Sequence, residues 1–259
     1  MSTEYADVTG RISSIESFGS VDGPGLRYIV FLAGCPFRCL YCHNPETWDP
    51  SGGKVQTAAD TLRAALRYRP YWKDVGGITV SGGEPLMQLD FLEALFALAK
   101  QEKKPVNTCI DTSGALFTRE GAFFEKLNRV LGNTDLLLLD LKHIDSKKHK
   151  ELVGKPNEHV LDFARYLADI GKPVWIRHVL VPGYTDDAVS LQRLSREIAS
   201  LGNVQRVDVL PYHGMARSKY QDLGIPYPLE DTSEPTADDV RRAKEILCVE
   251  DYQGYKSKA

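Results

Sequence analysis

Residues 28–43, YIVFLAGCPFRCLYCH, join an apolar segment directly to a loop with three cysteines. The segment 28–32 is rich in β-branched and aromatic residues, which favour a buried strand. The loop therefore starts at the carboxyl end of a strand, which is where α/β sheets bind cofactors and substrates. We expect the functional site of the chain at this edge of a sheet.

On either side of this stretch, and mainly after it, short apolar runs alternate with segments whose apolar residues repeat at three and four positions. The predicted strands are 28–32, 77–81, 106–111, 136–141, 174–179 and 204–210, and the predicted helices are 57–69, 89–101, 119–131, 160–171, 188–201 and 236–249. The strands lack a polar alternate face, which is typical of parallel strands covered on both sides. Six strand–helix units fit an open or partial barrel better than a closed barrel of eight. We predict a single α/β domain over 1–259, with parallel strands and outer helices.

The composition is that of a folded protein with a substantial core. Its 259 residues are 42% hydrophobic, which suffices for one large domain. The net charge of −3 and the pI of about 6.1 argue against binding to nucleic acids or anionic membranes, and favour small molecules or proteins as partners. The first ten residues lack the pattern of a secretory signal, and no apolar run approaches the ~20 residues of a membrane span. These features predict a soluble cytoplasmic protein.

The loop cysteines, Cys35, Cys39 and Cys42, have the spacing C-x3-C-x2-C. In a reducing compartment this pattern indicates a metal site rather than a set of disulfides. Thiolates are soft ligands that suit iron–sulfur clusters and zinc. Three thiolates can hold three irons of a cubane cluster and leave the fourth iron open to another ligand.

Two other interpretations of the cysteine loop remain. A structural zinc ion needs four ligands, so His43 or a distant residue would have to complete the site. Residues 39–43 also match C-x-x-C-H, the attachment motif of c-type haem. Haem attachment has no use for Cys35, and it normally occurs in exported proteins. A zinc- or haem-binding protein is therefore the alternative to an iron–sulfur protein.

The cysteine loop, with Tyr41 just before its last cysteine, resembles the signature of the radical S-adenosylmethionine (SAM) superfamily. The resemblance implies a 4Fe-4S cluster on Cys35, Cys39 and Cys42, and a partial (β/α)6 barrel of the radical SAM type. In that superfamily the open iron chelates the methionine part of SAM, and one electron breaks the S–C5′ bond to give a 5′-deoxyadenosyl radical. Zinc- or haem-binding proteins would lack this radical chemistry.

Polar motifs follow four of the other predicted strands. Residues 82–84, GGE, resemble the superfamily motif that holds the methionine amino group, whereas Glu84 could equally be a carboxylate favoured at a helix start. The motifs DTSG at 111–114 and DLK at 140–142 put charges where apolar strands end, which is costly unless the charges are paired or used. The motif LPYH at 210–213 gives the sixth predicted strand another polar end. As a set they resemble the activating enzymes of glycyl-radical enzymes, and segments 20–27, 42–48, 174–177 and 181–184 extend this resemblance over nearly the whole chain.

This resemblance implies two sets of binding residues. The expected contacts to SAM come from Tyr41, Cys42, His43, Gly83, Asp140, Leu141, Lys142 and His213. A monovalent cation, Na⁺ or K⁺, is expected beside SAM on Asp111, Thr112, Leu138 and Asp140. Leu138 stands where the family has a methionine, but a ligand that acts through its backbone carbonyl survives that exchange.

The resemblance also implies the partners. The chain is expected to remove a hydrogen atom from a glycine Cα of pyruvate formate-lyase, with another glycyl-radical enzyme as the alternative partner. Asp22 in the DGPG loop is the implied contact for the glycine-bearing loop, where we hypothesise that it pairs with an arginine of the partner; otherwise it is an ordinary turn residue.

A single cluster and an external electron donor are expected. Residues 46–81 contain no cysteine, and Cys109 and Cys248 fall in a predicted strand and the last predicted helix, where buried, inert thiols are the default. Flavodoxin or ferredoxin would supply the electron. Lys147, Lys148 and Lys150 form a basic run at the start of a helix, which is either solvated surface or a dock for an acidic flavodoxin.

Overall fold

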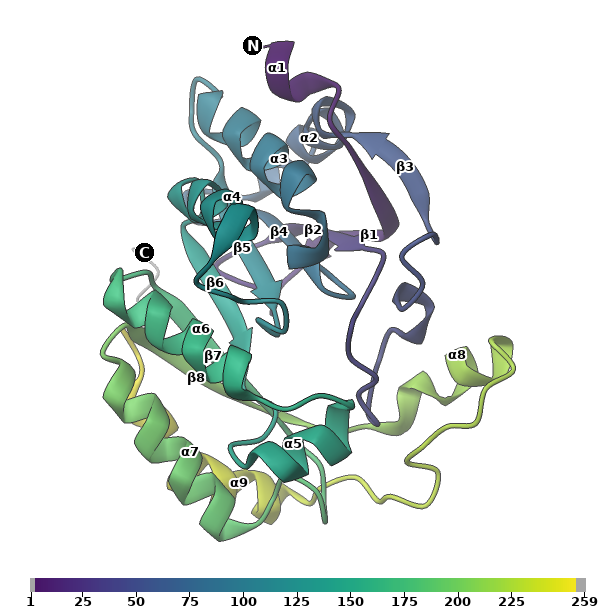
Figure 1. Cartoon of the computed structure of the whole chain (residues 1–259), viewed down its shortest axis with the longest axis vertical. Helices are drawn as coiled ribbons and strands as arrows, with labels where there is room; N and C mark the ends of the chain where they lie inside the picture. The colour runs from purple at the N-terminus through teal and green to yellow at the C-terminus, as the bar shows by residue number, and fades with distance from the viewer. Residues whose placement is uncertain (1–2, 255–259) are drawn as a thin grey trace.

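The computed structural model describes residues 3–254, which form one curved sheet with helices along its outer side (Figure 1). The strands are β1 Thr9–Gly19, β2 Arg27–Leu32, β3 Lys54–Thr57, β4 Gly77–Gly82, β5 Asn107–Thr112, β6 Leu136–Asp140, β7 Val174–Leu180 and β8 Val204–Pro211. Their order is β3-β1-β2-β4-β5-β6-β7-β8, and β2 and β4 to β8 run parallel. Because β3 and β8 are the two edges of this order, the sheet is an open barrel. The predicted fold class and all six predicted strands are confirmed.

The helices are α1 Thr3–Ala6, α2 Ala58–Leu66, α3 Leu89–Gln101, α4 Gly121–Gly132, α5 Ser146–Val153, α6 Glu158–Asp169, α7 Ala188–Leu201, α8 Arg217–Asp222 and α9 Ala237–Ile246. Local chemistry sets several of their ends. Asp187 accepts a hydrogen bond from the Ser190 N–H at the start of α7, and Gly202 ends that helix in a left-handed conformation. Helix α9 ends before Cys248, which is exposed, so the prediction of a buried thiol in the last helix was wrong.

One edge of the sheet is antiparallel, which the sequence did not predict. Strand β1 pairs antiparallel with β2 and with β3. The sequence of β1, TGRISSIESFG, mixes glycine and serine with apolar residues, so the strand has no continuous apolar run. Such a strand with one polar face is typical of an antiparallel pair.

The two faces of the sheet differ in character. Ile110, Leu137 and Ile176 point outward into the main core, which packs against the helices. Side chains alternate along a strand, so Leu138 after Leu137 and Trp175 before Ile176 point inward, where they pack together in a small inner cluster. Each fully buried side chain of this size contributes roughly 1.5–3 kcal/mol.

The inner face also carries polar residues, so the prediction that the strands lack a polar alternate face was wrong. At its base the buried Arg27 donates from Nε to the Thr79 hydroxyl at 2.9 Å and from Nη1 to the Asn107 side chain at 2.8 Å. Burial of such a charge is tolerated because its donors are used. The inside of the barrel is therefore built in layers, apolar and polar, below the site.

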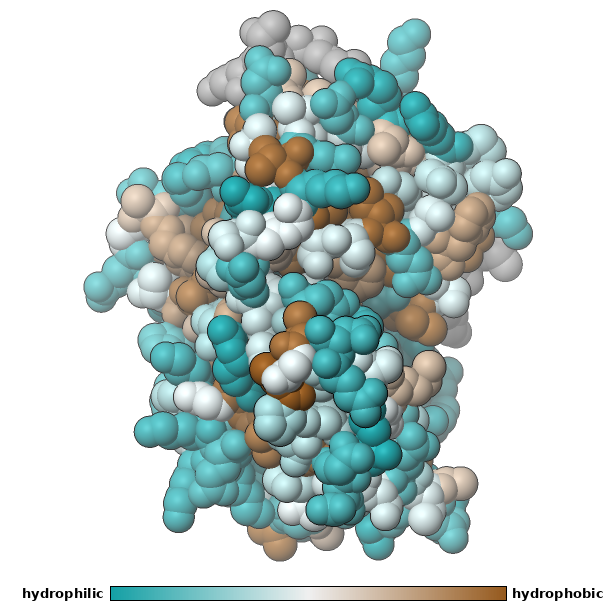
Figure 2. Space-filling model, turned by 90° about the vertical axis from the view of Figure 1, so that its right-hand side faces the viewer, coloured by the Kyte–Doolittle hydropathy of each residue, from teal (hydrophilic) through white to brown (hydrophobic). Residues whose placement is uncertain are grey.

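Among the described residues, no helix combines the length and the apolarity that a bilayer crossing requires. Figure 2 shows one side of the molecule, where hydrophobic residues form separate patches among hydrophilic ones.

Candidate functional site

A cavity of about 270 Å³ lies at the carboxyl ends of the parallel strands. This edge is where the sequence predicted the site. The cavity is lined by all three loop cysteines and by most of the other predicted site residues: Tyr41, His43, Gly83, Asp111, Thr112, Asp140, Lys142 and His213. Three predicted residues, Leu138, Leu141 and Asp22, are not among its lining.

The cysteine loop is fixed by its own backbone. The Gly34 N–H donates to the Thr47 carbonyl at 2.7 Å, and the Cys42 N–H closes a turn on the Cys39 carbonyl at 3.0 Å. Burial raises the pKa of Cys35 to about 12 and that of Cys39 to about 11. These thiols are therefore protonated at neutral pH and release their protons when they bind metal.

The donor set fits a cubane cluster. Three thiols from one loop line one cavity, and in such a cluster each thiolate binds a different iron. Within residues 3–254, no three His, Cys, Asp or Glu side chains are grouped closely enough to hold a single metal ion. The His43 ring packs edge-on against His213, with 4.9 Å between the ring centroids.

Gly83 is required for close packing between two loops. A Cβ at this position would lie 2.1 Å from the Gly34 carbonyl oxygen. The backbones instead hydrogen-bond, with the Gly83 N–H donating to Leu32 O at 2.9 Å and the Glu84 N–H to Gly34 O at 2.8 Å. The GGE turn and the cysteine loop thus form one rigid wall of the cavity.

Glu84 has the structural role that its place in the sequence suggested, and a second one. Its Oε1 accepts from the Leu86 N–H at 3.1 Å, which caps a short 3₁₀ helix, Pro85–Gln88. The same carboxylate accepts from the Thr112 hydroxyl at 2.5 Å and from the Ser113 N–H at 3.0 Å. Burial nevertheless raises its pKa. Glu84 ties the end of β4 to the end of β5.

Arg177 lies at the centre of the site, although the sequence did not identify it as a site residue. Its guanidinium contacts Asp111, donates from Nε to Asp140 Oδ1 at 3.1 Å, and lies 3.6 Å from Asp22 Oδ1. The side chain is 13% exposed. The available signal was the charged residue in the apolar run VWIR, which lies midway along β7.

The predicted cation ligands do not form an open cation site as their side chains stand. Ser81 donates to the second oxygen of Asp111 at 2.6 Å, and Thr112 is directed to Glu84. Leu138 is fully buried in the inner apolar cluster. The positive charge between the carboxylates is that of Arg177.

Lys142 and Asp140 form a buried ion pair at 3.0 Å. Although burial opposes its charge, Asp140 and its neighbours hold the pKa of Lys142 well above the ordinary value. The Lys142 ammonium lies 5.5 Å from the centroid of the Tyr41 ring. Leu141 is buried in the main core, and its N–H donates to the Arg177 carbonyl at 3.0 Å. Leu141 therefore fixes the backbone between two charged side chains.

Asp22 belongs to the acidic group around Arg177. Burial, and then the nearby Asp111, raise the pKa of Asp22 to about 6. Its carbonyl accepts a hydrogen bond from the Thr79 hydroxyl at 2.7 Å, which anchors the DGPG loop to the inside of β4. The Asp22 side chain is 21% exposed. Asp22, together with Asp140 at 18%, is thus one of the two members of this group that a visiting chain could reach.

The segment around α8 supports the cysteine loop from outside, which the sequence did not indicate. Lys219 donates to the Asn44 side chain and to Glu46, both at 2.7 Å. The Tyr220 ring packs edge-on against Trp48 at 5.8 Å. These partners lie more than 170 residues apart in the sequence, so only the folded chain brings them together.

His149 packs behind the cysteine loop and predicts an acid sensitivity. Its ring lies 5.6 Å from the Phe37 ring and its Nδ1 bonds the Lys155 carbonyl at 2.6 Å. Burial lowers the pKa of His149 to about 4. Since this lies below the ordinary value of about 6.5, the unfolded chain takes up the proton first as the pH falls. We expect the free energy of unfolding to fall by about 2 kcal/mol between pH 7 and pH 5 because of His149.

Urea unfolding of the His149→Gln variant at both pH values tests this expectation. On acidification from pH 7 to pH 5, the variant should lose about 2 kcal/mol less stability than the wild type. An equal loss in wild type and His149→Gln would contradict the assignment.

Comparisons with known proteins agree with the site. The family model described as Radical SAM superfamily matches residues 29–193. The chain is 50% identical over 257 residues to the pyruvate formate-lyase-activating enzyme of Streptococcus mutans, which covers 98% of this chain and 97% of that relative. It is 48% identical over 248 residues to that of Listeria monocytogenes, which covers 95% of this chain and 99% of the relative.

Solved structures share the fold. A domain of the pyruvate formate-lyase-activating enzyme from Bacteroides vulgatus has a TM-score of 0.52 at 28% identity, and covers 68% of this chain and 94% of that one. Streptococcus suis SuiB, bound to its precursor peptide SuiA, has a TM-score of 0.66 at 20% identity, and covers 90% of this chain and 46% of that one. At this lower identity the likeness concerns the fold alone.

Proposed function

The chain belongs to the radical SAM superfamily and, within it, to the pyruvate formate-lyase-activating enzymes, and we propose that its cavity is where it carries out that activation. The enzyme generates a glycyl radical on pyruvate formate-lyase. The observation that carries the proposal is that Cys35, Cys39 and Cys42 line the same cavity as charged residues of β5, β6 and β7, namely Asp111, Asp140 and Arg177. A binding site for metal alone would not need those charges.

The three cysteines would hold a 4Fe-4S cluster, and the cavity beside them would hold SAM. When bound, the cluster supplies one electron that breaks the S–C5′ bond of SAM, and the resulting 5′-deoxyadenosyl radical takes a hydrogen atom from a glycine Cα. The transfer is of an atom rather than a proton, so no general base is required. The work of the protein is to position the groups and to exclude side reactions.

Each remaining site residue has a task suited to its chemistry. Lys142 is charged and fixed by Asp140, so it would bind the carboxylate of the methionine moiety. His43 and His213, whose rings pack together on the cavity wall, would contact the nucleoside with Tyr41. Gly83 would present its backbone to the methionine amino group. A monovalent cation near Asp111 would require Arg177 to give up its present contacts.

Asp22 would receive the glycine-bearing loop of the partner. Its partly exposed carboxylate could pair with an arginine there, a contact worth about 1.5–3 kcal/mol. We therefore expect Asp22→Asn to lower kcat/KM for activation by about tenfold or more. Partner-independent formation of 5′-deoxyadenosine should change little. Unchanged activation by this variant would remove Asp22 from the docking site.

The decisive experiment is anaerobic reconstitution followed by electron paramagnetic resonance. The reduced protein, SAM and pyruvate formate-lyase should give a glycyl-radical doublet and a matching amount of 5′-deoxyadenosine. If 5′-deoxyadenosine formed without the doublet, a different glycyl-radical enzyme would be the partner. If bound zinc or covalent haem took the place of iron and sulfide, the proposal would be wrong.

A further inference from the structure

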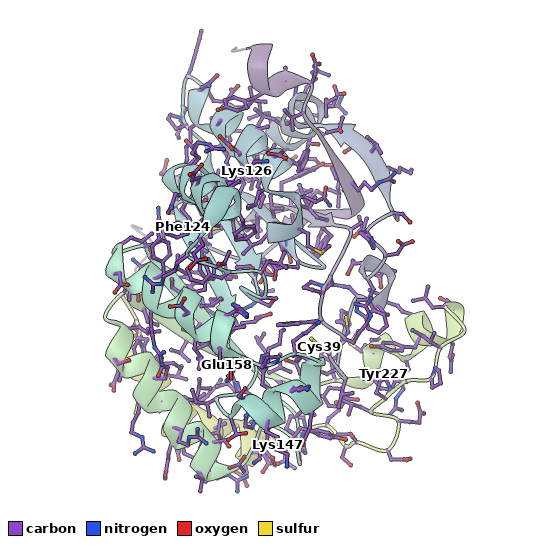
Figure 3. The ribbon with its side chains drawn as sticks, in the orientation of Figure 1. Cys39, Phe124, Lys126, Lys147, Glu158 and Tyr227 are labelled. Atoms are coloured by element: carbon purple, nitrogen blue, oxygen red, sulfur yellow. The ribbon has the colours of Figure 1, made fainter. Side chains whose placement is uncertain are left out.

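Helix α5 is bonded directly to the outside of the cysteine loop. The Arg38 N–H donates to the Val153 carbonyl at 2.9 Å, and the Leu40 N–H donates to the Leu152 carbonyl at 3.0 Å. The rings of Phe37 and His149 complete the contact. Figure 3 shows Cys39 on the inner side of this helix and Lys147 on its other side. Helix and loop form one unit at the base of the proposed cluster site.

Part of the cysteine loop, at Arg38, lies between the cavity and solvent without a covering helix. Phe37 and Cys39 line the cavity, whereas Arg38 between them is exposed. The Arg38 guanidinium donates to the carbonyls of Cys35 at 2.8 Å and Phe37 at 2.7 Å. A positive charge is therefore held on the outer surface of the loop. An approach from this side does not pass through the cavity that SAM and the partner glycine would occupy.

The exposed side of α5 adds further positive charge. His149, Leu152 and Val153 form its buried side, so the lysines project into solvent. We define the α5 surface as Lys147, Lys150, Lys155 and Arg38, all of them exposed.

The charges of the α5 surface are available to a partner. Across residues 3–254, the side chains of Lys147, Lys150 and Lys155 make no ion pair, whereas neighbouring Lys148 pairs with Asp187 at 2.9 Å. Glu151 and Glu158 are the exposed acids nearby in the sequence, and Glu158 accepts from the Ser146 hydroxyl at 2.6 Å. The surface keeps a positive surplus in a chain of net charge −3.

We propose that the α5 surface docks an acidic one-electron carrier protein, which reduces the cluster through the cysteine loop. The inference rests on the proposed function, because it presumes a cluster on the three cysteines. One electron leaves the reduced carrier and enters the cluster; the carrier is oxidised by one electron, and no atom is transferred. Complementary charge suits this task, since it speeds encounter and sets orientation without requiring tight binding.

Reversing the charge of the surface tests the proposal. The triple variant Lys147→Glu, Lys150→Glu and Lys155→Glu changes no described ion pair, and a flavodoxin serves as the probe. At about 0.05 M salt, we expect the Kd of flavodoxin for the triple-variant holoenzyme to be about tenfold or more above that for the wild type. At about 0.5 M salt, this difference in Kd should be smaller. The rate of cluster reduction by flavodoxin hydroquinone should fall in parallel, whereas reduction by dithionite should not change.

A control lies at the amino ends of the parallel strands, away from the cysteine loop. Lys103 and Lys104 are exposed just before β5 begins, whereas the cysteine loop follows the carboxyl end of β2. The double variant Lys103→Glu, Lys104→Glu should bind flavodoxin like the wild type; the one described ion pair that it breaks is the exposed contact of Lys104 with Asp74 at 3.5 Å. Replacing Lys147, Lys150 and Lys155 of the α5 surface by glutamine should give a Kd between those of the wild type and the triple glutamate variant.

Two results would distinguish a failure of the docking proposal from a failure of the proposed function. Equal Kd and equal salt dependence for the triple variant, the control and the wild type would overturn docking at α5. If dithionite-reduced wild-type enzyme failed to form a glycyl radical, the proposed function itself would fail, whatever the affinity for flavodoxin.

Discussion

Cys39→Ser is expected to abolish cluster binding and, with it, all cleavage of SAM. The buried Cys39 thiol is the middle ligand of the loop, and a serine hydroxyl is a poor, hard ligand for iron. Two remaining thiolates cannot hold three irons. Iron and sulfide per chain should fall from about four of each to near zero, and no 5′-deoxyadenosine should form.

The protein carries its own controls for this substitution. Cys248→Ser changes an exposed thiol beyond α9, and Cys109→Ser changes a buried thiol on the inner face of β5. Both variants should keep full iron content. Because Cys39 packs in the main core, circular dichroism of the cluster-free protein should accompany the iron assay. A Cys39→Ser protein that retained four irons and cleaved SAM would show that another residue completes the ligand set.

Arg177→Ala is expected to have the largest effect on stability. The substitution leaves Asp111 and Asp140 buried without the guanidinium that contacts both of them. It also removes the guanidinium that lies 3.6 Å from Asp22 Oδ1. Removing one partner of a buried ion pair typically costs about 3–5 kcal/mol. Urea unfolding of the cluster-free protein at neutral pH should show a decrease of this size in the free energy of unfolding. In the variant, Lys142 still pairs with Asp140, whereas Asp111 loses the ion pair that it makes with Arg177.

Arg177→Lys separates charge from geometry. A lysine keeps the positive charge, but it cannot bridge two carboxylates with a planar fork of donors. We expect a stability between those of the wild type and Arg177→Ala, and a weaker affinity for SAM because the positions of Asp111 and Asp140 are less fixed. The Arg129→Ala variant, which breaks an ion pair with Glu93 on the outer helices, should lose much less stability. Equal stability of Arg177→Ala and wild type would show that the ion pairs of Arg177 give no net stabilisation.

Features written in short stretches of the chain were predictable from the sequence. The cysteine spacing is local. Six strands can be recognised in the sequence because each is a continuous apolar run that ends near a polar motif. Parallel strands bring those ends to one edge, so Asp111, Asp140 and Lys142 could be placed together without a structure. Local capping likewise fixed α7, through Asp187 and Gly202.

The parts that depend on long-range geometry were not predictable. Whether Arg177 points inward depends on the register of β7 beside β6, where Arg177 pairs with Asp140. A shift of one residue would turn its side chain outward, and no local pattern sets that shift. The same holds for the Lys219 bridge to Glu46, since a contact across 173 residues exists only when the chain has folded back on itself. Sequence therefore specified the reactive ligands, whereas the curvature of the sheet into an open barrel selected which charges hold them in place.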